Sequence, residues 1–121
     1  FELVDKGFRI TGNKIIMNDP NAGIYLKDCD GNPGNEGLIA NNFVKNRNAN
    51  GSANHGIWMR TCTYVKLYHN SVSLRSGWVT SSRSFYQESG GNNLDLRNNI
   101  FLNRSGGYAF VPDCSGRYRI L

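Results

Sequence analysis

The chain has 121 residues, of which 39% are hydrophobic, and it carries 14 Lys plus Arg against 9 Asp plus Glu. This length suits one domain and is too short for two ordinary ones. The 17 Asn, 14 Gly and 10 Ser make up 41 of the 121 residues, and because helix interiors disfavour all three types, the composition excludes a helical bundle. No run of 18 apolar residues is present, so we expect no membrane-spanning helix.

The net charge of +5 arises mainly from nine Arg residues that are scattered singly along the chain. Nucleic-acid-binding domains usually gather such residues into a patch, so we expect no nucleic-acid partner and only a weak preference for anionic partners, such as acidic polysaccharides. Phosphate-binding glycine loops and nucleophile elbows are absent from the sequence, and we expect no cofactor. Because neither an initiator Met nor a signal peptide is seen, we expect residues 1–121 to form a single domain that is a fragment of, or a module from, a longer chain.

Two short motifs alternate along the chain, and both repeat. The first spans residues 10–13 (ITGN) and returns at 39–42 (IANN), 67–70 (LYHN) and 96–99 (LRNN), so that its last Asn recurs after 29, 28 and 29 residues. The second spans residues 24–29 (IYLKDC), returns at 57–62 (IWMRTC) and 109–114 (AFVPDC), and has a looser copy at 84–89 (SFYQES). Both motifs alternate apolar with polar side chains, which is the period of a β-strand.

Two strand motifs in each repeat favour a solenoid in which every strand pairs in parallel with its equivalent one coil later. We therefore predict an all-β fold with about four coils. The repeated Asn supports this prediction, because its side chain tolerates a left-handed turn and hydrogen-bonds its equivalents in the neighbouring coils. The predicted inward ladder consists of Asn13, Asn42, Asn70 and Asn99.

Three cysteines, Cys29, Cys62 and Cys114, share one position of the second motif, and Ser89 takes that position in the looser copy. Neighbouring coils of a solenoid lie about 4.8 Å apart with parallel side chains, which is poor geometry for a disulfide. We predict that all three cysteines are free, buried thiols.

The alternation within the second motif also predicts an outward face. If Ile24, Leu26 and their equivalents point inward, two neighbouring columns point outward: Tyr25, Trp58, Phe85 and Phe110, and beside them Lys27, Arg60, Gln87 and Pro112. An exposed apolar stripe usually contacts something. One hypothesis is a glycan-binding strip in which aromatic rings stack on sugars while Lys27 and Arg60 bind hydroxyl or carboxylate groups. Two others remain open: the connections at 30–37, 46–55 and 76–83 fold over the stripe, or the stripe is a protein interface.

The outward face of the first motif is mostly polar and would bring Lys66, Tyr68, Asp95 and Arg97 together on adjacent coils. A lyase acting on uronic acids needs a base and a cation that neutralises the carboxylate. These residue types supply both, but they also occur on any polar β-surface.

Metal ligands are sparse. Asp28, Asp30 and Glu36 form a weak calcium candidate, because oxygen-bearing side chains alternate there as in a calcium loop, although Pro33 stands where a Gly is needed. We predict no other metal site. His69 occupies the position held by Asn41 and Asn98, which predicts a hydrogen-bonding role in a turn.

The segments 67–72 (LYHNSV) and 96–101 (LRNNIF), followed by 106–109 (GGYA), resemble repeats of right-handed parallel β-helices of the pectate-lyase-like superfamily, especially those of secreted or surface proteins of Bacteroidota. The resemblance covers residues from about 8 to 114 and implies a right-handed β-helix in a bacterial extracellular or cell-surface setting. It carries over no catalytic residue, because lyases, hydrolases, epimerases and adhesins all share the fold.

Two hypotheses about function follow. The first is a non-catalytic secreted or surface module that contacts glycans or acts in adhesion. The alternative is a fragment of a polysaccharide lyase or hydrolase that acts on an acidic polysaccharide. Because both ends of a solenoid expose strand edges unless they are capped, and residues 1–4 and 118–121 are apolar, we also expect end-on self-association or a remainder of the parent chain at the ends.

Overall fold

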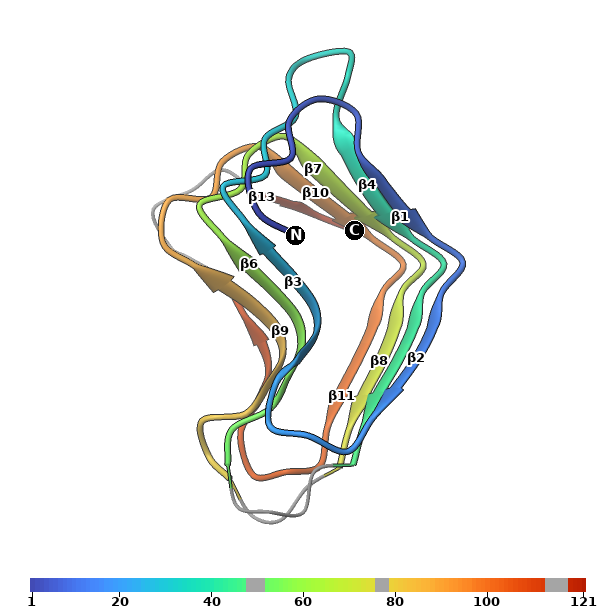
Figure 1. Cartoon of the computed structure of the whole chain (residues 1–121), viewed down its shortest axis with the longest axis vertical. Helices are drawn as coiled ribbons and strands as arrows, with labels where there is room; N and C mark the ends of the chain where they lie inside the picture. The colour runs from blue at the N-terminus through green and yellow to red at the C-terminus, as the bar shows by residue number, and fades with distance from the viewer. Residues whose placement is uncertain (48–51, 76–78, 113–117) are drawn as a thin grey trace.

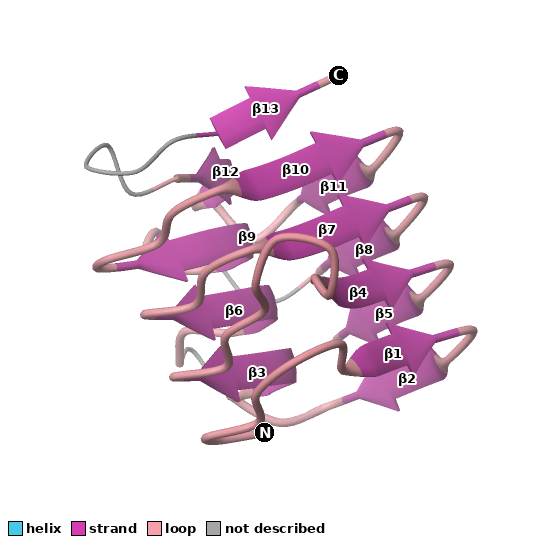
Figure 2. Ribbon diagram, turned by 90° about the horizontal axis from the view of Figure 1, so that it is seen from above, coloured by secondary structure: helices cyan, strands magenta, loops and turns pink. Residues whose placement is uncertain are grey.

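The chain is seen in a computed structural model that describes residues 1–47, 52–75, 79–112 and 118–121. Its strands form three parallel sheets that stack as a β-solenoid (Figures 1 and 2). The chain passes from sheet 1 to sheet 2 to sheet 3 and winds about three turns from β1 to β10, so that four three-strand units stack and β13 follows them. The all-β, parallel solenoid predicted from the repeats is confirmed.

Each sheet collects the equivalent strands of successive units. Sheet 1 contains β1 (Arg9–Thr11), β4 (Gly37–Ala40), β7 (Val65–Tyr68), β10 (Leu94–Arg97) and β13 (Tyr118–Ile120). Sheet 2 contains β2 (Lys14–Met17), β5 (Phe43–Asn46), β8 (Ser71–Leu74) and β11 (Ile100–Asn103). Sheet 3 contains β3 (Ala22–Lys27), β6 (His55–Arg60), β9 (Arg83–Glu88) and β12 (Tyr108–Val111). Within the described ranges, no helix has the length and apolarity needed to cross a membrane.

A two-residue corner joins sheet 1 to sheet 2 in every unit. Its first residue has a left-handed backbone, with φ of 70° at Gly12, 55° at Asn41, 55° at His69 and 52° at Asn98. Gly and Asn tolerate this conformation better than other residues, which explains the motif, and His69 takes the turn position predicted for it.

The second residue of each corner belongs to the predicted asparagine ladder, which is confirmed. The side-chain amide of Asn13 donates to Oδ1 of Asn42 (2.9 Å), Asn42 to Asn70 (3.0 Å) and Asn70 to Asn99 (2.9 Å). The backbone N–H groups of Asn13, Asn42 and Asn70 donate to the same oxygens. Asn42 and Asn70 are buried, so the ladder satisfies polar groups that water does not reach.

The core is a set of apolar columns between the three sheets. Sheet 1 contributes the column Ile10, Ile39, Leu67 and Leu96, and sheet 3 contributes Ile24, Ile57 and Phe85 together with Leu26 and Met59. Val44 and Val72 of sheet 2 close the third side. Parallel register keeps each column continuous, because equivalent residues lie directly above one another.

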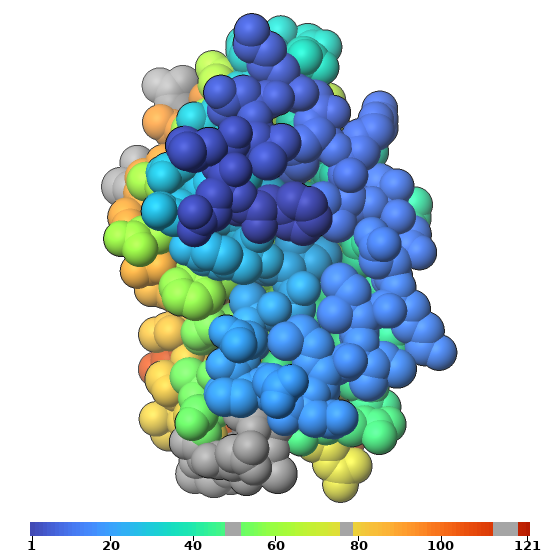
Figure 3. All heavy atoms as spheres, in the orientation of Figure 1, coloured from blue at the N-terminus to red at the C-terminus, as the bar shows by residue number. Residues whose placement is uncertain are grey.

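The two ends of the solenoid are covered to different extents. At the first end, the backbone of residues 1–3 pairs with β3: the amide of Lys27 donates to the carbonyl of Phe1 (3.0 Å) and that of Leu3 to the carbonyl of Lys27 (3.1 Å). Figure 3 shows these N-terminal residues lying across the end face. At the other end, β13 pairs with β10. Each terminal segment of the described chain therefore pairs with the strand next to it.

Candidate functional site

Three aromatic side chains form a column on the outer face of sheet 3. Tyr25, Trp58 and Tyr86 occupy paired positions of β3, β6 and β9. The ring centroids of Tyr25 and Trp58 lie 4.8 Å apart, and those of Trp58 and Tyr86 lie 5.9 Å apart with nearly parallel planes. All three side chains are partly exposed. We call these residues the aromatic column.

Polar groups surround the aromatic column. The indole N–H of Trp58 donates to Oε2 of Glu88 (3.0 Å). The guanidinium of Arg83 lies over the Tyr86 ring, 4.3 Å from its centroid, a favourable cation–π arrangement. The His55 ring lies 5.0 Å from that of Trp58 and 5.6 Å from that of Tyr86. These contacts fix the orientation of the rings.

His55 is a buried imidazole in a positively charged environment. Burial, and secondly the charge of Arg83, lower its pKa to about 4. Its Nδ1 and the Nε of Arg83 are buried, and neither has a hydrogen-bond partner among the described residues. His55 is therefore neutral at physiological pH and belongs to the structural support of the aromatic column.

The sequence-based placement of Phe85, Gln87 and Phe110 was wrong by one position. Phe85 pairs with Ile57, and Phe110 pairs with Phe85, so both lie in the inward column. Phe85 and Gln87 are buried, whereas the outward position is held by Tyr86. A shift of one residue in a strand exchanges its two faces. The observed register buries a ring without a hydroxyl and keeps the hydroxyl of Tyr86 on the outer face, which avoids an unpaired buried polar group.

Charged side chains line the aromatic column on one side. Lys27, Arg60 and Glu88 pair across the same three strands. Lys27 lies 3.9 Å from Glu2, and Arg60 is exposed with no side-chain partner in the described parts of the chain. In the outward column beside the rings, Glu88 thus takes the place that the sequence analysis gave to Gln87.

The connection at 30–37 does not fold over the aromatic column. It lies beside sheet 1, where Gly34, Asn35 and Glu36 line a surface pocket of about 350 Å³. The connections at 46–55 and 76–83 lie partly outside the described residues, at 48–51 and 76–78.

The predicted polar cluster on sheet 1 is present. The Tyr68 hydroxyl donates to Oδ2 of Asp95 (2.7 Å), and Arg97 forms an ion pair with the same carboxylate (2.7 Å). The Arg97 guanidinium lowers the pKa of Asp95, while burial and the Asp95 carboxylate raise the pKa of the Tyr68 phenol. Lys66 pairs with Glu36 instead (3.2 Å), so it lies on the same face but engages a different partner.

The pocket beside this cluster is polar. In addition to the 30–37 connection, its wall contains Arg9, Leu38, Lys66 and Tyr68. Arg9 is exposed and has no side-chain partner in the described ranges, whereas Lys66 is neutralised by Glu36. The arrangement suits binding of one negative charge better than abstraction of a proton, because the raised pKa of Tyr68 keeps that phenol protonated at neutral pH.

The three calcium candidates have separate partners. Oδ1 of Asp28 accepts from the Thr61 hydroxyl, and Oδ1 of Asp30 accepts from the amide and hydroxyl of Thr63, both at 2.8 Å. Glu36 pairs with Lys66, and backbone N–H groups, together with this lysine, lower its pKa. Among the residues that the structure describes, no three metal-binding side chains gather into a group. The acidic residues here tie corners to the next unit.

Cys29 and Cys62 are free, buried thiols, as predicted. Burial raises the pKa of Cys62 to about 12, so this thiol stays protonated and unreactive. Cys114 lies outside the described residues. Thr63 pairs with Asn92, which places Gly91 rather than Ser89 next to Cys62 in the third unit.

Sequence reasoning missed Tyr86, His55 and Arg83 at this site. The signal that distinguishes Tyr86 from Phe85 is the hydroxyl group: across the units, Tyr25, Trp58 and Tyr86 are amphipathic, whereas Phe85 and Phe110 are wholly apolar. His55 and Arg83 share one register position, but they stand outside the six-residue motif, so no repeat drew attention to them.

Comparison with known proteins gives no relative. No family model matches the chain, and neither a curated protein nor a solved structure matches it. The fold and its two outer faces are therefore the basis for functional reasoning.

Proposed function

We propose that this protein is a non-catalytic carbohydrate-binding module that contacts glycans with the aromatic column on sheet 3. The observation that carries the proposal is the alignment of Tyr25, Trp58 and Tyr86 on three successive strands, partly exposed and fixed by their mutual packing. Rigid aromatic side chains give contact area at a low cost in conformational entropy.

The chemistry of the column fits a sugar better than a purely apolar ligand. The hydroxyl groups of Tyr25 and Tyr86 have no hydrogen-bond partner among the described residues, and both are available to sugar hydroxyls. Arg60 and Lys27 lie directly beside the rings. Apolar ring surface next to unengaged hydroxyl groups and cations is what a polyhydroxylated, partly acidic chain requires.

The setting that we propose is extracellular or on a bacterial cell surface, among the pectate-lyase-like β-helix proteins of Bacteroidota that the repeats resemble. The parallel solenoid supports this placement at the level of fold. Antibody labelling of intact cells of the source organism tests it, since a surface protein is labelled without permeabilisation and an internal one is not.

A glycan array followed by titration tests carbohydrate binding. Trp58→Ala is expected to weaken binding of the selected glycan about tenfold to a hundredfold, because truncation of a central aromatic contact typically costs 2 kcal/mol or more. The matched control is Phe43→Ala, since Phe43 is an exposed aromatic residue on sheet 2 and is 40% accessible. Equal affinity of Trp58→Ala and the unaltered protein, or the absence of any bound glycan, would reject the proposal.

A second candidate function would use the pocket on sheet 1, which contains Arg9, Lys66 and Tyr68. This is the alternative in which the chain acts on an acidic polysaccharide. A lyase reaction leaves an unsaturated uronate that absorbs in the ultraviolet, so incubation with acidic polysaccharides separates cleavage from binding. The raised pKa of Tyr68 favours binding, and we expect no absorbance to develop.

A further inference from the structure

Three arginines that are far apart in the sequence form a column at the end of sheet 2. Arg47, Arg75 and Arg104 directly follow β5, β8 and β11, and the register of these strands places them at equivalent positions of successive units. Their backbone N–H groups continue the parallel pairing, each donating at 2.9 Å to a carbonyl of the preceding unit. Neighbouring units lie about 4.8 Å apart, so residues separated by 28 and 29 positions become neighbours. We call these residues the arginine column.

No acidic side chain compensates the arginine column. All three arginines are exposed, and none forms an ion pair with another described residue. On sheet 1, by contrast, Lys66 pairs with Glu36 and Arg97 pairs with Asp95. Stacked like charges repel one another, so the arginine column gains stability when an anion binds beside it.

Two lysines extend the positive charge across the outer face of sheet 2. Lys14 and Lys45 stand at outward positions of β2 and β5. Of the acidic residues in the described ranges, only Asp19 lies within two positions of a sheet 2 strand. These five cations and one carboxylate leave nine basic and eight acidic residues in the rest of the sequence. Most of the net charge of +5 therefore lies on this one face.

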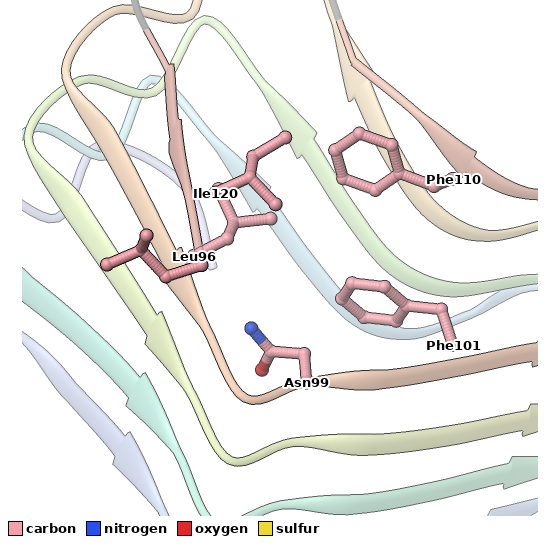
Figure 4. A pocket seen from close by; sticks show the side chains of 6 residues that line it. Leu96, Asn99, Phe101, Phe110 and Ile120 are labelled. Atoms are coloured by element: carbon pink, nitrogen blue, oxygen red, sulfur yellow. The ribbon is translucent and has the colours of Figure 1, made fainter.

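Exposed apolar side chains share the face with these cations. Ile16 of β2 is 52% exposed, Phe43 of β5 is 40% exposed, and Ile100 and Leu102 of β11 are 64% and 41% exposed. Phe101, between the last two, points inward toward Phe110 (Figure 4). Ile100 and Leu102 thus point sideways out of the sheet, a direction that alternation along the strand determines, whatever adjoins either end of the solenoid.

A face with both features fits the interface of an anionic lipid bilayer. The strands of sheet 2 run side by side in one direction (Figure 1), and so present a broad face rather than a single ridge. Long Arg and Lys side chains reach the phosphates and carboxylates of the head groups, while shorter apolar side chains enter the boundary of the acyl region. A soluble polyanion would use the cations alone and leave the apolar side chains in water. A bilayer accounts for both sets.

From these observations we propose that the outer face of sheet 2 docks on a lipid surface that contains anionic head groups. The contact is peripheral, and the stacking direction of the solenoid lies along the membrane plane, so that every unit contributes. Each cation near the surface adds to the attraction, which decays within a Debye length. The proposal does not depend on glycan binding, because the aromatic column belongs to sheet 3.

Co-sedimentation with lipid vesicles tests the proposal. One set of vesicles consists of phosphatidylcholine alone, and the other contains phosphatidylcholine and phosphatidylserine in a two-to-one ratio. We expect the protein to sediment with the anionic vesicles only, and to be released as the salt concentration is raised, because salt screens the attraction.

Two double variants separate this face from net charge. Arg47→Gln with Arg75→Gln is expected to lower the partition constant about tenfold or more, since each cation at an anionic surface strengthens binding several-fold. The matched control is Lys6→Gln with Arg119→Gln, which removes the same charge from exposed residues outside sheet 2. We expect this control to bind within about twofold of the unaltered chain, because its cations lie away from the lipid.

A third double variant tests the apolar part of the contact. Ile16→Ser with Leu102→Ser keeps every charge and is expected to weaken vesicle binding about fivefold, because less apolar surface leaves water. Circular dichroism confirms that each variant is folded.

Four results overturn the proposal: no binding to anionic vesicles, equal binding to both sets of vesicles, equal loss of binding in the arginine variant and its matched control, or unchanged binding of the serine variant. The last result, combined with equally tight binding to dextran sulfate, would identify a soluble polyanion as the ligand of the arginine column instead of a bilayer.

Discussion

Single asparagine side chains determine how the corners of this solenoid stack. Asn70 is fully buried: its amide donates to the carbonyl of Ile39 (2.9 Å) and to Oδ1 of Asn99 (2.9 Å), and its own oxygen accepts from Asn42. Each ladder residue therefore satisfies polar groups in both neighbouring units. Removing one ladder residue leaves several partners unpaired at once.

We predict that Asn70→Ala lowers the free energy of unfolding by about 2–4 kcal/mol, because buried donors and acceptors lose their partners. Urea denaturation measures this change. Asn18→Ala is the control, since Asn18 is exposed in the turn after β2, and a change within about 0.5 kcal/mol is expected. Equal stability of the two variants would show that the ladder contributes nothing.

A second prediction concerns His55, whose pKa is about 4 in the folded protein and 6.5 without its environment. Since the unfolded chain binds the proton more readily, stability is full above pH 6.5 and falls as the pH approaches 4. The difference corresponds to about 3 kcal/mol. Denaturation at several pH values should show this loss.

Two variants separate His55 from the carboxylates that also titrate near pH 4. His55→Gln removes the titrating group, so its stability should change less between pH 6.5 and pH 4 than that of the unaltered chain. His69→Asn replaces the exposed histidine with the residue found at two of the equivalent corners, and it serves as the control for loss of a histidine elsewhere in the chain. If His55→Gln keeps the full dependence, His55 is not its source.

At the scale of the strand, register decides which aromatic residues are buried. In β9, Phe85 lies in the core with Phe101 and Phe110, at centroid distances of 5.5 and 5.1 Å, while Tyr86 faces outward beside Trp58. Phe85 and Tyr86, which are adjacent in the sequence, thus lie on opposite faces of the strand. A strand motif read by apolar character alone does not tell them apart.

This register predicts opposite results for two changes of one hydroxyl group. Phe85→Tyr is expected to lower the free energy of unfolding by about 2 kcal/mol or more, because the hydroxyl enters a filled apolar core. Tyr86→Phe removes a hydroxyl from the outer face and is expected to change it by no more than about 0.5 kcal/mol. Thermal or urea denaturation compares the two. If Tyr86→Phe were the more damaging change, β9 would have the other register.

At the scale of the whole molecule, the repeats were sufficient to predict the fold. The Asn spacing determines the corner between sheets 1 and 2, and Asn13, Asn42, Asn70 and Asn99 stand where the sequence predicted. The candidate site was predicted only for the first two units, where Tyr25 and Trp58 lie in identical motifs. In the third and fourth units the motif is degenerate. There a shift of one residue hardly changes the quality of the sequence alignment, but it exchanges the inward and outward faces of the strand.

The sequence separation between paired strand residues also governs how this molecule folds. Residues that pair between the named strands lie between 24 positions apart, as Leu94 and Tyr118 do, and 33 positions apart, as Ile24 and Ile57 do. Hence no strand in the described parts of the chain finds a partner until a full turn has been closed, which makes the first pair of units the slow step in folding. Every later unit adds to a finished template at the entropic cost of one loop, so folding can start at any neighbouring pair and spread in both directions.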